Sequence, residues 1–117
     1  MDISKIEHDL ISEIKLSEIQ AKVFLLLVTT GKNTGENIGK KLDISSEDAK
    51  KTANQLVELG SIIETAENIF EAMHPRFTAV NMYRKMCERE KIEFKRNVIV
   101  DNIGVALERS YEDARTK

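Results

Sequence analysis

Three polar side chains between residues 50 and 54 have the chemistry for binding DNA: Lys50, Lys51 and Asn54. A lysine ammonium neutralises a backbone phosphate, and an asparagine amide can pair with a base edge in the major groove. A helix over residues 46–59 would turn these side chains and that of Ser46 to one face. Its opposite face would carry the apolar side chains that bury it in a core, which are Ala49, Ala53 and Leu56.

Basic residues on both sides of this helix could neutralise further phosphates. Lys40 and Lys41 end the segment before it, and Arg76 follows the segment after it. We predict all three as DNA contacts. For Arg76 and the basic residues that follow it as far as Arg89, ion pairs across a dimer interface are an equally good interpretation.

Glu47 and Asp48 place two negative charges in the first turn of the same helix. Carboxylates at a helix N-terminus interact favourably with the helix dipole, by about 0.3–1 kcal/mol each. We therefore assign both acids to the stability of the helix. For Glu47, accepting a hydrogen bond from the N4 amino group of cytosine is the functional alternative.

The charge is unevenly distributed along the chain. Residues 1–73 contain 8 Lys/Arg and 13 Asp/Glu, residues 74–117 contain 10 and 7, and the net charge of the 117 residues is −2. Segment 61–73 has no Lys or Arg. This balance does not favour strong non-specific binding of nucleic acid, which usually accompanies a basic domain.

The sequence gives little support for a catalytic, cofactor-binding or metal-binding site. No nucleophile is paired with a suitable base, so we predict no enzyme activity and no cofactor. His74 and His8 are the two histidines, and few carboxylates lie near His74 in the sequence, so no metal site is expected. The single Cys87 excludes an internal disulfide. We interpret it as a small buried residue, with an intersubunit disulfide or a redox sensor as the alternative.

Capping residues and glycines mark the helices that would position these side chains. Residues 1–15 have apolar side chains at helical spacing and predict a short amphipathic helix. Ser17 begins the capping-box pattern S-x-x-Q of a second helix, which Gly31 ends. Thr34 and Ser45 are then the N-caps of a short third helix and of the helix that carries the lysines.

Two short β-compatible runs, SIIET and IFEAM, follow and are joined by AEN. Asn68 tolerates the positive φ of a tight turn, so these runs predict a β-hairpin. Three helices followed by a hairpin is the order of a winged helix-turn-helix domain, here over residues 16–74. The predicted fold class is therefore mainly α with a small β-hairpin, followed by a long C-terminal helix.

Residues 75–117 are predicted to form that helix, with Pro75 at its start. Gly104 and the β-branched run NVIVDNI would permit a kink or break near residue 100. About 38 continuous helical residues would span roughly 57 Å, too long to be buried against so small a domain. We therefore predict a homodimer through this helix. Its interface would contain Val80, Tyr83, Cys87, Phe94, Val98, Ile99, Ile103 and Leu107.

The segment LSEIQAKVFLLLVTTGKNTGENIGKKLDISSEDAKKTANQLVELGSIIE resembles the N-terminal domain of the TrmB-like archaeal transcription regulators. In that family, a helix LS-x-x-x-A-K-V-[YF]-x-x-L precedes a helix-turn T-x-x-x-I-G/A-x-x-L-x-[IV]-S/P, and the reading helix ends in L-x-x-x-G-[LI]-[IV]-x. The likeness covers about 60 of the 117 residues. The matching residues are Leu16, Ser17, Ala21, Lys22, Val23 and Phe24, then Thr34, Ile38, Gly39, Leu42, Ile44 and Ser45, then Leu56, Gly60, Ile62 and Ile63.

The resemblance implies a dimeric, sequence-specific DNA-binding regulator whose reading helix, 46–59, enters the major groove. The hairpin without basic residues and the acidic start of the reading helix depart from the family pattern. Larger family members also carry a sugar-binding C-terminal domain, for which 117 residues leave no room, so a sugar-responsive repressor is not expected. The alternative hypothesis is a winged helix that contacts protein in a transcription-related assembly and has little affinity for DNA.

The sequence contains no signal-peptide pattern and no run of about 18 apolar residues. We therefore expect a cytoplasmic protein without membrane contact. Double-stranded DNA and a second copy of the chain are the expected partners, and the sequence identifies no small-molecule effector.

Overall fold

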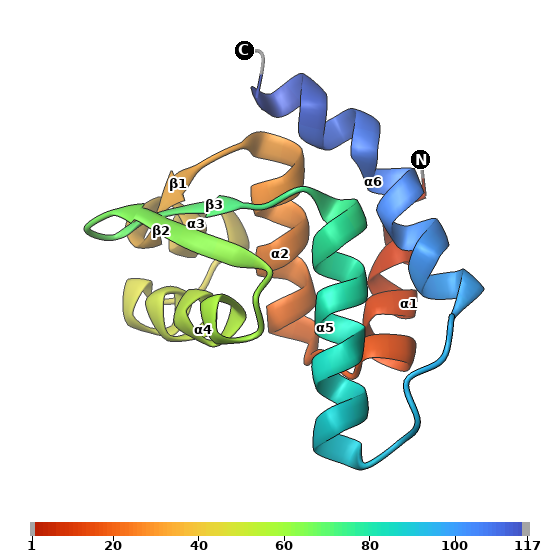
Figure 1. Cartoon of the computed structure of the whole chain (residues 1–117). Coiled ribbons are helices and arrows are strands. Elements are labelled where there is room, and N and C mark those ends of the chain that lie inside the picture. The colour runs from red at the N-terminus through yellow and green to blue at the C-terminus, as the bar shows by residue number, and fades with distance from the viewer. Residues whose placement is uncertain (1, 116–117) are drawn as a thin grey trace.

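The structure is a computed structural model that describes residues 2–115. Met1 and residues 116–117, the outer ends of the predicted segments 1–15 and 75–117, lie outside the described residues. Helix α2 lies at the centre, with the sheet, α3 and α4 on one side of it and α1, α5 and α6 on the other (Figure 1). In chain order the elements are α1 (Ile3–Ile14), α2 (Glu18–Thr30), β1 (Asn33–Thr34), α3 (Gly35–Leu42), α4 (Ser46–Glu58), β2 (Ile62–Ala66), β3 (Ile69–Ala72), α5 (Pro75–Glu90) and α6 (Val98–Arg115).

The predicted capping box at the start of α2 is present. The Ser17 hydroxyl accepts a hydrogen bond from the Gln20 backbone N–H at 3.1 Å, and the Gln20 side chain accepts one from the Ser17 N–H at 3.0 Å. Gly31 ends the helix with a φ of 87°, a conformation that residues with a side chain rarely adopt. Both ends of α2 are therefore set by local sequence, as predicted.

The helix-turn-helix consists of α3, a turn at residues 43–45 and α4. Thr34 and Ser45 cap the two helices, each accepting from a backbone N–H in the first turn, at 3.1 and 3.0 Å. Gly39 packs directly against the turn, and a Cβ atom there would lie 2.8 Å from the Ile44 carbonyl oxygen. The glycine therefore allows α3 and the turn to approach closely enough to fix the position of α4.

The predicted hairpin forms the wing of the domain from β2 and β3. Asn68 has a φ of 63° in its turn, as expected from its residue type. The short strand β1, which the sequence did not predict, pairs antiparallel with β3 through Asn33 and Phe70, so the strand order is β1-β3-β2. Two residues are too few for a recognisable alternation of apolar side chains. The predicted fold class is confirmed.

The C-terminal segment contains two helices and not one continuous helix. Helix α5 ends before Lys91, which adopts a left-handed conformation with a φ of 56°. A loop over residues 91–97 reverses the chain, and the Asn97 side chain accepts from two backbone N–H groups in the first turn of α6, at 3.0 and 3.2 Å. A break was predicted near residue 100, and the structure places it slightly earlier, at residues 91–97.

Gly104 is a packing contact between α6 and α5. The two helices cross there so closely that a Cβ atom on Gly104 would lie 2.8 Å from the Arg76 Cα. Because α6 folds back over α5, α2 and α1, the described chain extends 37 Å at most, compared with the roughly 57 Å estimated for one continuous helix. Part of the apolar face that was expected to need a second chain is therefore covered by the same chain.

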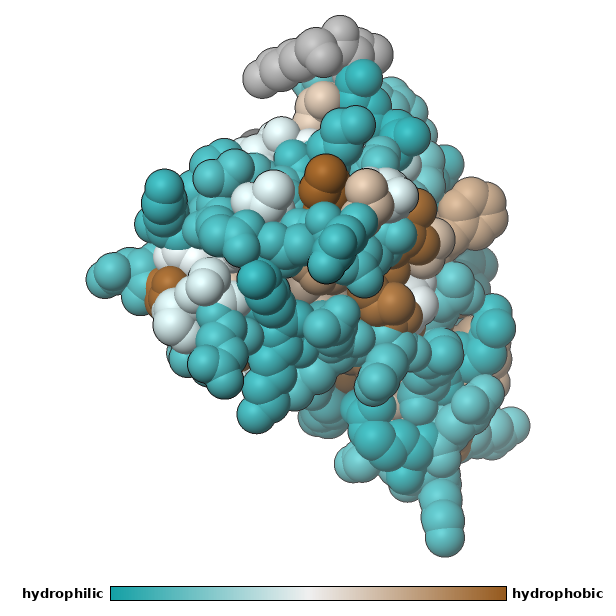
Figure 2. Space-filling model, turned by 90° about the vertical axis from the view of Figure 1, so that its left-hand side faces the viewer, coloured by the Kyte–Doolittle hydropathy of each residue, from teal (hydrophilic) through white to brown (hydrophobic). Residues whose placement is uncertain are grey.

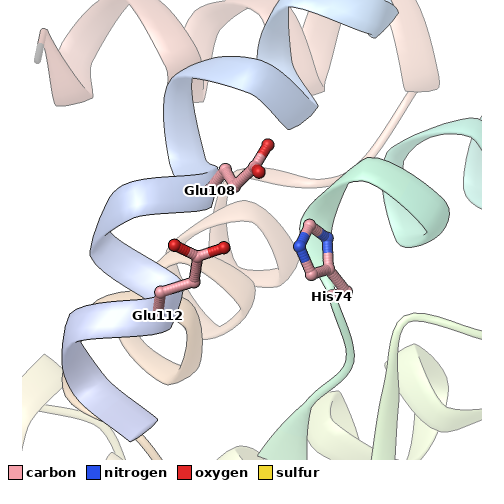
Figure 3. A group of neighbouring side chains, drawn as sticks. All are labelled: His74, Glu108 and Glu112. Atoms are coloured by element: carbon pink, nitrogen blue, oxygen red, sulfur yellow. The ribbon is translucent and has the colours of Figure 1, made fainter. Parts of the chain in front are cut away.

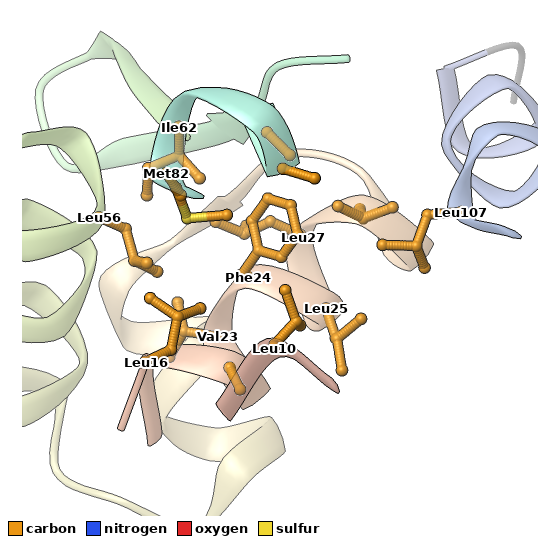
Figure 4. Close-up of a cluster of buried hydrophobic side chains, with 14 of the residues drawn as sticks. Leu10, Leu16, Val23, Phe24, Leu25, Leu27, Leu56, Ile62, Met82 and Leu107 are labelled. Atoms are coloured by element: carbon orange, nitrogen blue, oxygen red, sulfur yellow. The ribbon is translucent and has the colours of Figure 1, made fainter. Parts of the chain in front are cut away.

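One apolar core holds the helices together. Phe24 and Leu27 of α2 lie at its centre, with Leu10 from α1, Leu56 from α4 and Leu107 from α6 around them (Figure 4). Each of these side chains is at most 1% exposed. Within residues 2–115, no helix combines the length and the apolar character needed to cross a membrane.

The residues predicted for the dimer interface fall into three groups in this fold. The first group corrects the prediction that all of them face a second copy. Buried in the core of the single chain are Cys87, Ile103 and Leu107. Half-buried beside that core are Val80 and Tyr83. The third group is exposed: Phe94 by 48%, Val98 by 61% and Ile99 by 43%. A dimer interface could therefore use the third group but not the first.

Candidate nucleic-acid interface

Helix α4 turns a polar face to solvent on the side of the molecule that carries the wing. Figure 2 looks onto this side, which is covered mainly by hydrophilic side chains. Ser46, Lys51 and Asn54 are exposed, whereas Ala49 and Ala53 are completely buried. The predicted division of this helix into an inner and an outer face is confirmed.

Lys50 forms an ion pair with another residue of the domain. Its ammonium lies 3.0 Å from one carboxylate oxygen of Glu36 in α3, and the other oxygen accepts from the Asn68 side-chain amide at 2.6 Å. The Asn68 backbone N–H donates in turn to Glu64 at 2.7 Å. Gly35 leaves room for this arrangement, because a Cβ atom there would lie 2.5 Å from the Lys50 Cγ. A single carboxylate therefore connects α3, α4 and the tip of the wing.

Glu36 is charged at neutral pH. The hydrogen bond from Lys50, and after it one from the backbone N–H of Glu36 itself, lower the pKa of this carboxyl below its ordinary value. A carboxyl with a lowered pKa in the folded state stabilises the fold above its unfolded pKa, and this contribution is lost as the pH falls through the folded pKa. The link between α3, α4 and the wing is therefore fully formed at neutral pH and weakens in acid.

The other predicted contacts lie in two different settings. Lys40 and Lys41 are exposed in the last turn of α3, where positive charges also interact favourably with the helix dipole. Arg76 instead pairs with Glu108 of α6, with 3.3 Å between its Nε and the carboxylate oxygen. The structure thus places Lys40 and Lys41 at the end of the helix that precedes α4. Arg76, in contrast, forms an ion pair within the chain.

Acidic residues border this interface. Glu47 and Asp48 are exposed in the first turn of α4, and Glu64 and Glu67 are exposed on the wing. The sequence analysis identified Glu47 and Asp48 and the absence of basic residues from the wing, but it missed the role of Glu36 as the partner of Lys50. The two residues lie on different helices, and the pairing depends on the angle of the helix-turn-helix, for which no local pattern exists.

Comparison with known proteins supports the assignment of the fold. The family model described as sugar-specific transcriptional regulator TrmB matches residues 11–84 of the 117. No curated protein and no solved structure matches the chain. The matched range contains α2, the helix-turn-helix and the whole wing, and it extends into α5. This chain therefore belongs to the TrmB family of transcriptional regulators and contains the helix-turn-helix DNA-binding domain of that family.

Proposed function

We propose that this protein is a sequence-specific DNA-binding transcription regulator that acts as a homodimer and inserts α4 into the major groove. The exposed polar face of α4, on a helix-turn-helix that matches the TrmB family, carries the proposal. Asn54 and Ser46 have side chains that can pair with base edges. Lys51, Lys40 and Lys41 would neutralise phosphates beside the groove.

Glu36 would limit the affinity of this interface. Lys50 can reach a phosphate only by leaving Glu36, which lies 3.0 Å from its ammonium. The carboxylate also adds a negative charge beside the α4 surface that is to approach DNA. Both effects oppose binding, and both would be removed by an uncharged residue of the same shape.

Replacing Glu36 by glutamine is therefore expected to tighten the binding of duplex DNA. Because Lys50 would then reach its phosphate without first leaving Glu36, the affinity should rise at every salt concentration, while the slope of log K against log salt concentration should stay close to that of wild type. Fluorescence anisotropy with a labelled duplex at several salt concentrations would measure both quantities. Glu90→Gln, which makes the same charge change at the end of α5, is the control and should bind like wild type. Weaker binding by Glu36→Gln would contradict the role given to Lys50.

The homodimer would form through apolar side chains that α6 and the preceding loop leave exposed. Phe94, Val98 and Ile99 are close in sequence and 43–61% exposed. Ile92 in the same loop is 52% exposed and adds to this surface. Two copies joined at this surface must place their α4 helices about 34–36 Å apart to enter successive major grooves.

A charged residue in this surface is expected to separate the two copies. Ile99→Asp would bury a charge in the interface, so the protein should run as a single chain of 13.3 kDa in sedimentation equilibrium. Ile63→Asp is a matched control, because Ile63 lies on the wing and is also 43% exposed. A wild-type protein that is monomeric at all concentrations, or a dimer that only Ile63→Asp disrupts, would refute this interface.

A module that contacts protein is the second candidate function. The charge of the wing favours it, because the exposed hairpin carries Glu64 and Glu67 and segment 61–73 has no Lys or Arg. Such a wing would be repelled by phosphates and could instead meet a basic surface on a protein. The two functions differ in how binding to DNA responds to salt.

A further inference from the structure

The fold brings His74 together with two carboxylates that lie far from it in the sequence. His74 immediately precedes α5, and Glu108 and Glu112 lie one turn apart on α6. The potential ligand atoms of the three side chains all lie within 4.8 Å of one another. Figure 3 shows both glutamates directed toward the imidazole from the neighbouring helix. No metal site was predicted at His74 because these carboxylates become its neighbours only when α6 folds back.

The imidazole of His74 is held in one orientation. Its Nδ1 accepts a hydrogen bond from the Arg76 backbone N–H at 3.2 Å, so Nε2 is the nitrogen that faces the glutamates (Figure 3). The ring centroid lies 5.1 Å from that of Tyr111 and 6.0 Å from that of Phe77. The two aromatic contacts can remain when a ligand binds at Nε2, so they would limit the conformational freedom that the ring loses on binding.

We propose that His74, Glu108 and Glu112 form a binding site for a first-row divalent transition-metal cation such as Zn²⁺. Imidazole nitrogen and carboxylate oxygen are both ligands of Zn²⁺, and three protein ligands leave positions for water. The nitrogen ligand selects against Mg²⁺ and Ca²⁺, which prefer oxygen ligands alone. The inference stands apart from the proposed function, because it requires neither DNA nor a second copy.

Two adjustments accompany binding. Metal–ligand bonds of about 2.0–2.2 Å require the carboxylates to approach Nε2 more closely, which the partly exposed Glu108 and exposed Glu112 can do by rotation of their side chains. Binding at Nε2 also places the proton on Nδ1, so the Arg76 N–H loses its acceptor. The ion would replace this cap with a direct link between the start of α5 and α6.

Arg76 competes with the cation. Its guanidinium lies 3.3 Å from a Glu108 oxygen, and the bonding capacity of that carboxylate must be shared or surrendered when a metal ion binds. Two substitutions are therefore expected to change the affinity for the metal ion in opposite directions. Loss of a ligand should weaken binding, and loss of the Arg76 charge should strengthen it.

Isothermal titration of the full chain with Zn²⁺ tests the site. His74→Gln and Glu112→Gln are each expected to weaken Zn²⁺ binding by about tenfold or more, and Arg76→Gln is expected to tighten it. His8→Gln, which removes the other histidine, is the control and should bind Zn²⁺ as wild type does. Because His74 also caps α5, Glu112→Gln provides the test on a residue with no capping role, and circular dichroism of each variant checks its fold.

Thermal unfolding gives an independent readout, because a ligand that binds only the folded state raises the Tm. Zn²⁺ should raise the Tm of wild type, and the same Zn²⁺ concentration should raise that of Glu112→Gln by clearly less, and Mg²⁺ should affect neither. Equal Zn²⁺ affinities of wild type and Glu112→Gln, no binding to wild type, or binding lost only in His8→Gln would each overturn the proposal.

Discussion

Replacing Leu107 by alanine is expected to lower the free energy of unfolding by about 2–5 kcal/mol, the usual cost of removing a large buried side chain. Leu107 is completely buried in the core of a single chain, where α6 packs on α5, α2 and α1. If it instead lay in a contact between two long helices, the loss would appear as a weaker dimer. The position of α6 therefore decides which property changes.

Urea unfolding at two protein concentrations separates these cases. The loss of stability in Leu107→Ala should be the same at both concentrations, because an intramolecular core does not depend on mass action. Val105→Ala, on the same helix but 53% exposed, should change the free energy of unfolding by less than about 0.5 kcal/mol. A loss for Leu107→Ala that disappears at high concentration would show that α6 packs against a second chain.

The Lys50→Ala/Lys51→Ala double variant is expected to show the largest loss of DNA binding. Two phosphate contacts would be removed, so the affinity at low salt should fall by at least about tenfold and the salt slope should decrease by about 1.8. Both lysines lie on or beside the outer face of α4, so the fold and the oligomeric state should be retained. The ion pair of Lys50 with Glu36 is exposed, and such pairs contribute little to stability.

A mobility-shift assay with the double variant measures this loss. Lys5→Ala/Lys22→Ala makes the same change in net charge on α1 and α2, where both lysines form exposed ion pairs, and it serves as the control. The control should retain most of the wild-type affinity. Equal losses in the two variants would mean that net charge, and not the α4 surface, governs binding.

The helices and the wing could be predicted because their signals are local. The Ser17 capping box, the Thr34 and Ser45 caps and the positive φ of Asn68 all depend on a few neighbouring residues, and all are present in the structure. The spacing of Ala49, Ala53 and Leu56 likewise determines which face of α4 is buried. These local sequence patterns were sufficient to predict the fold class.

The reversal of the chain between α5 and α6 was misjudged because its cause is partly non-local. Lys91 adopts a left-handed conformation that its residue type does not indicate. Asn97 does have the residue type of an N-cap, and it could have been recognised before the β-branched run. Its side chain also donates to Glu13 of α1 at 3.0 Å, a contact that exists only after α6 has folded back.

The electrostatic details of the candidate sites were beyond sequence reasoning for the same reason. Lys50 is separated from Glu36 by the turn, and His74 is separated from Glu108 by the whole of α5 and the following loop. No spacing rule connects such residues, because their proximity depends on the packing angles of helices. The sequence could identify residues with suitable chemistry, and the fold decides which of them meet.

Titration of a random duplex with the wild-type protein at 50 and 200 mM salt tests the central claim, that α4 binds DNA. If Lys40, Lys41, Lys50 and Lys51 each neutralise one phosphate, log K should fall with log salt with a slope of about −3.6, which is roughly a hundredfold loss over this range. Steep weakening of this kind is the predicted result. No binding at 50 mM, or binding that does not respond to salt, would contradict the claim and favour a module that contacts protein.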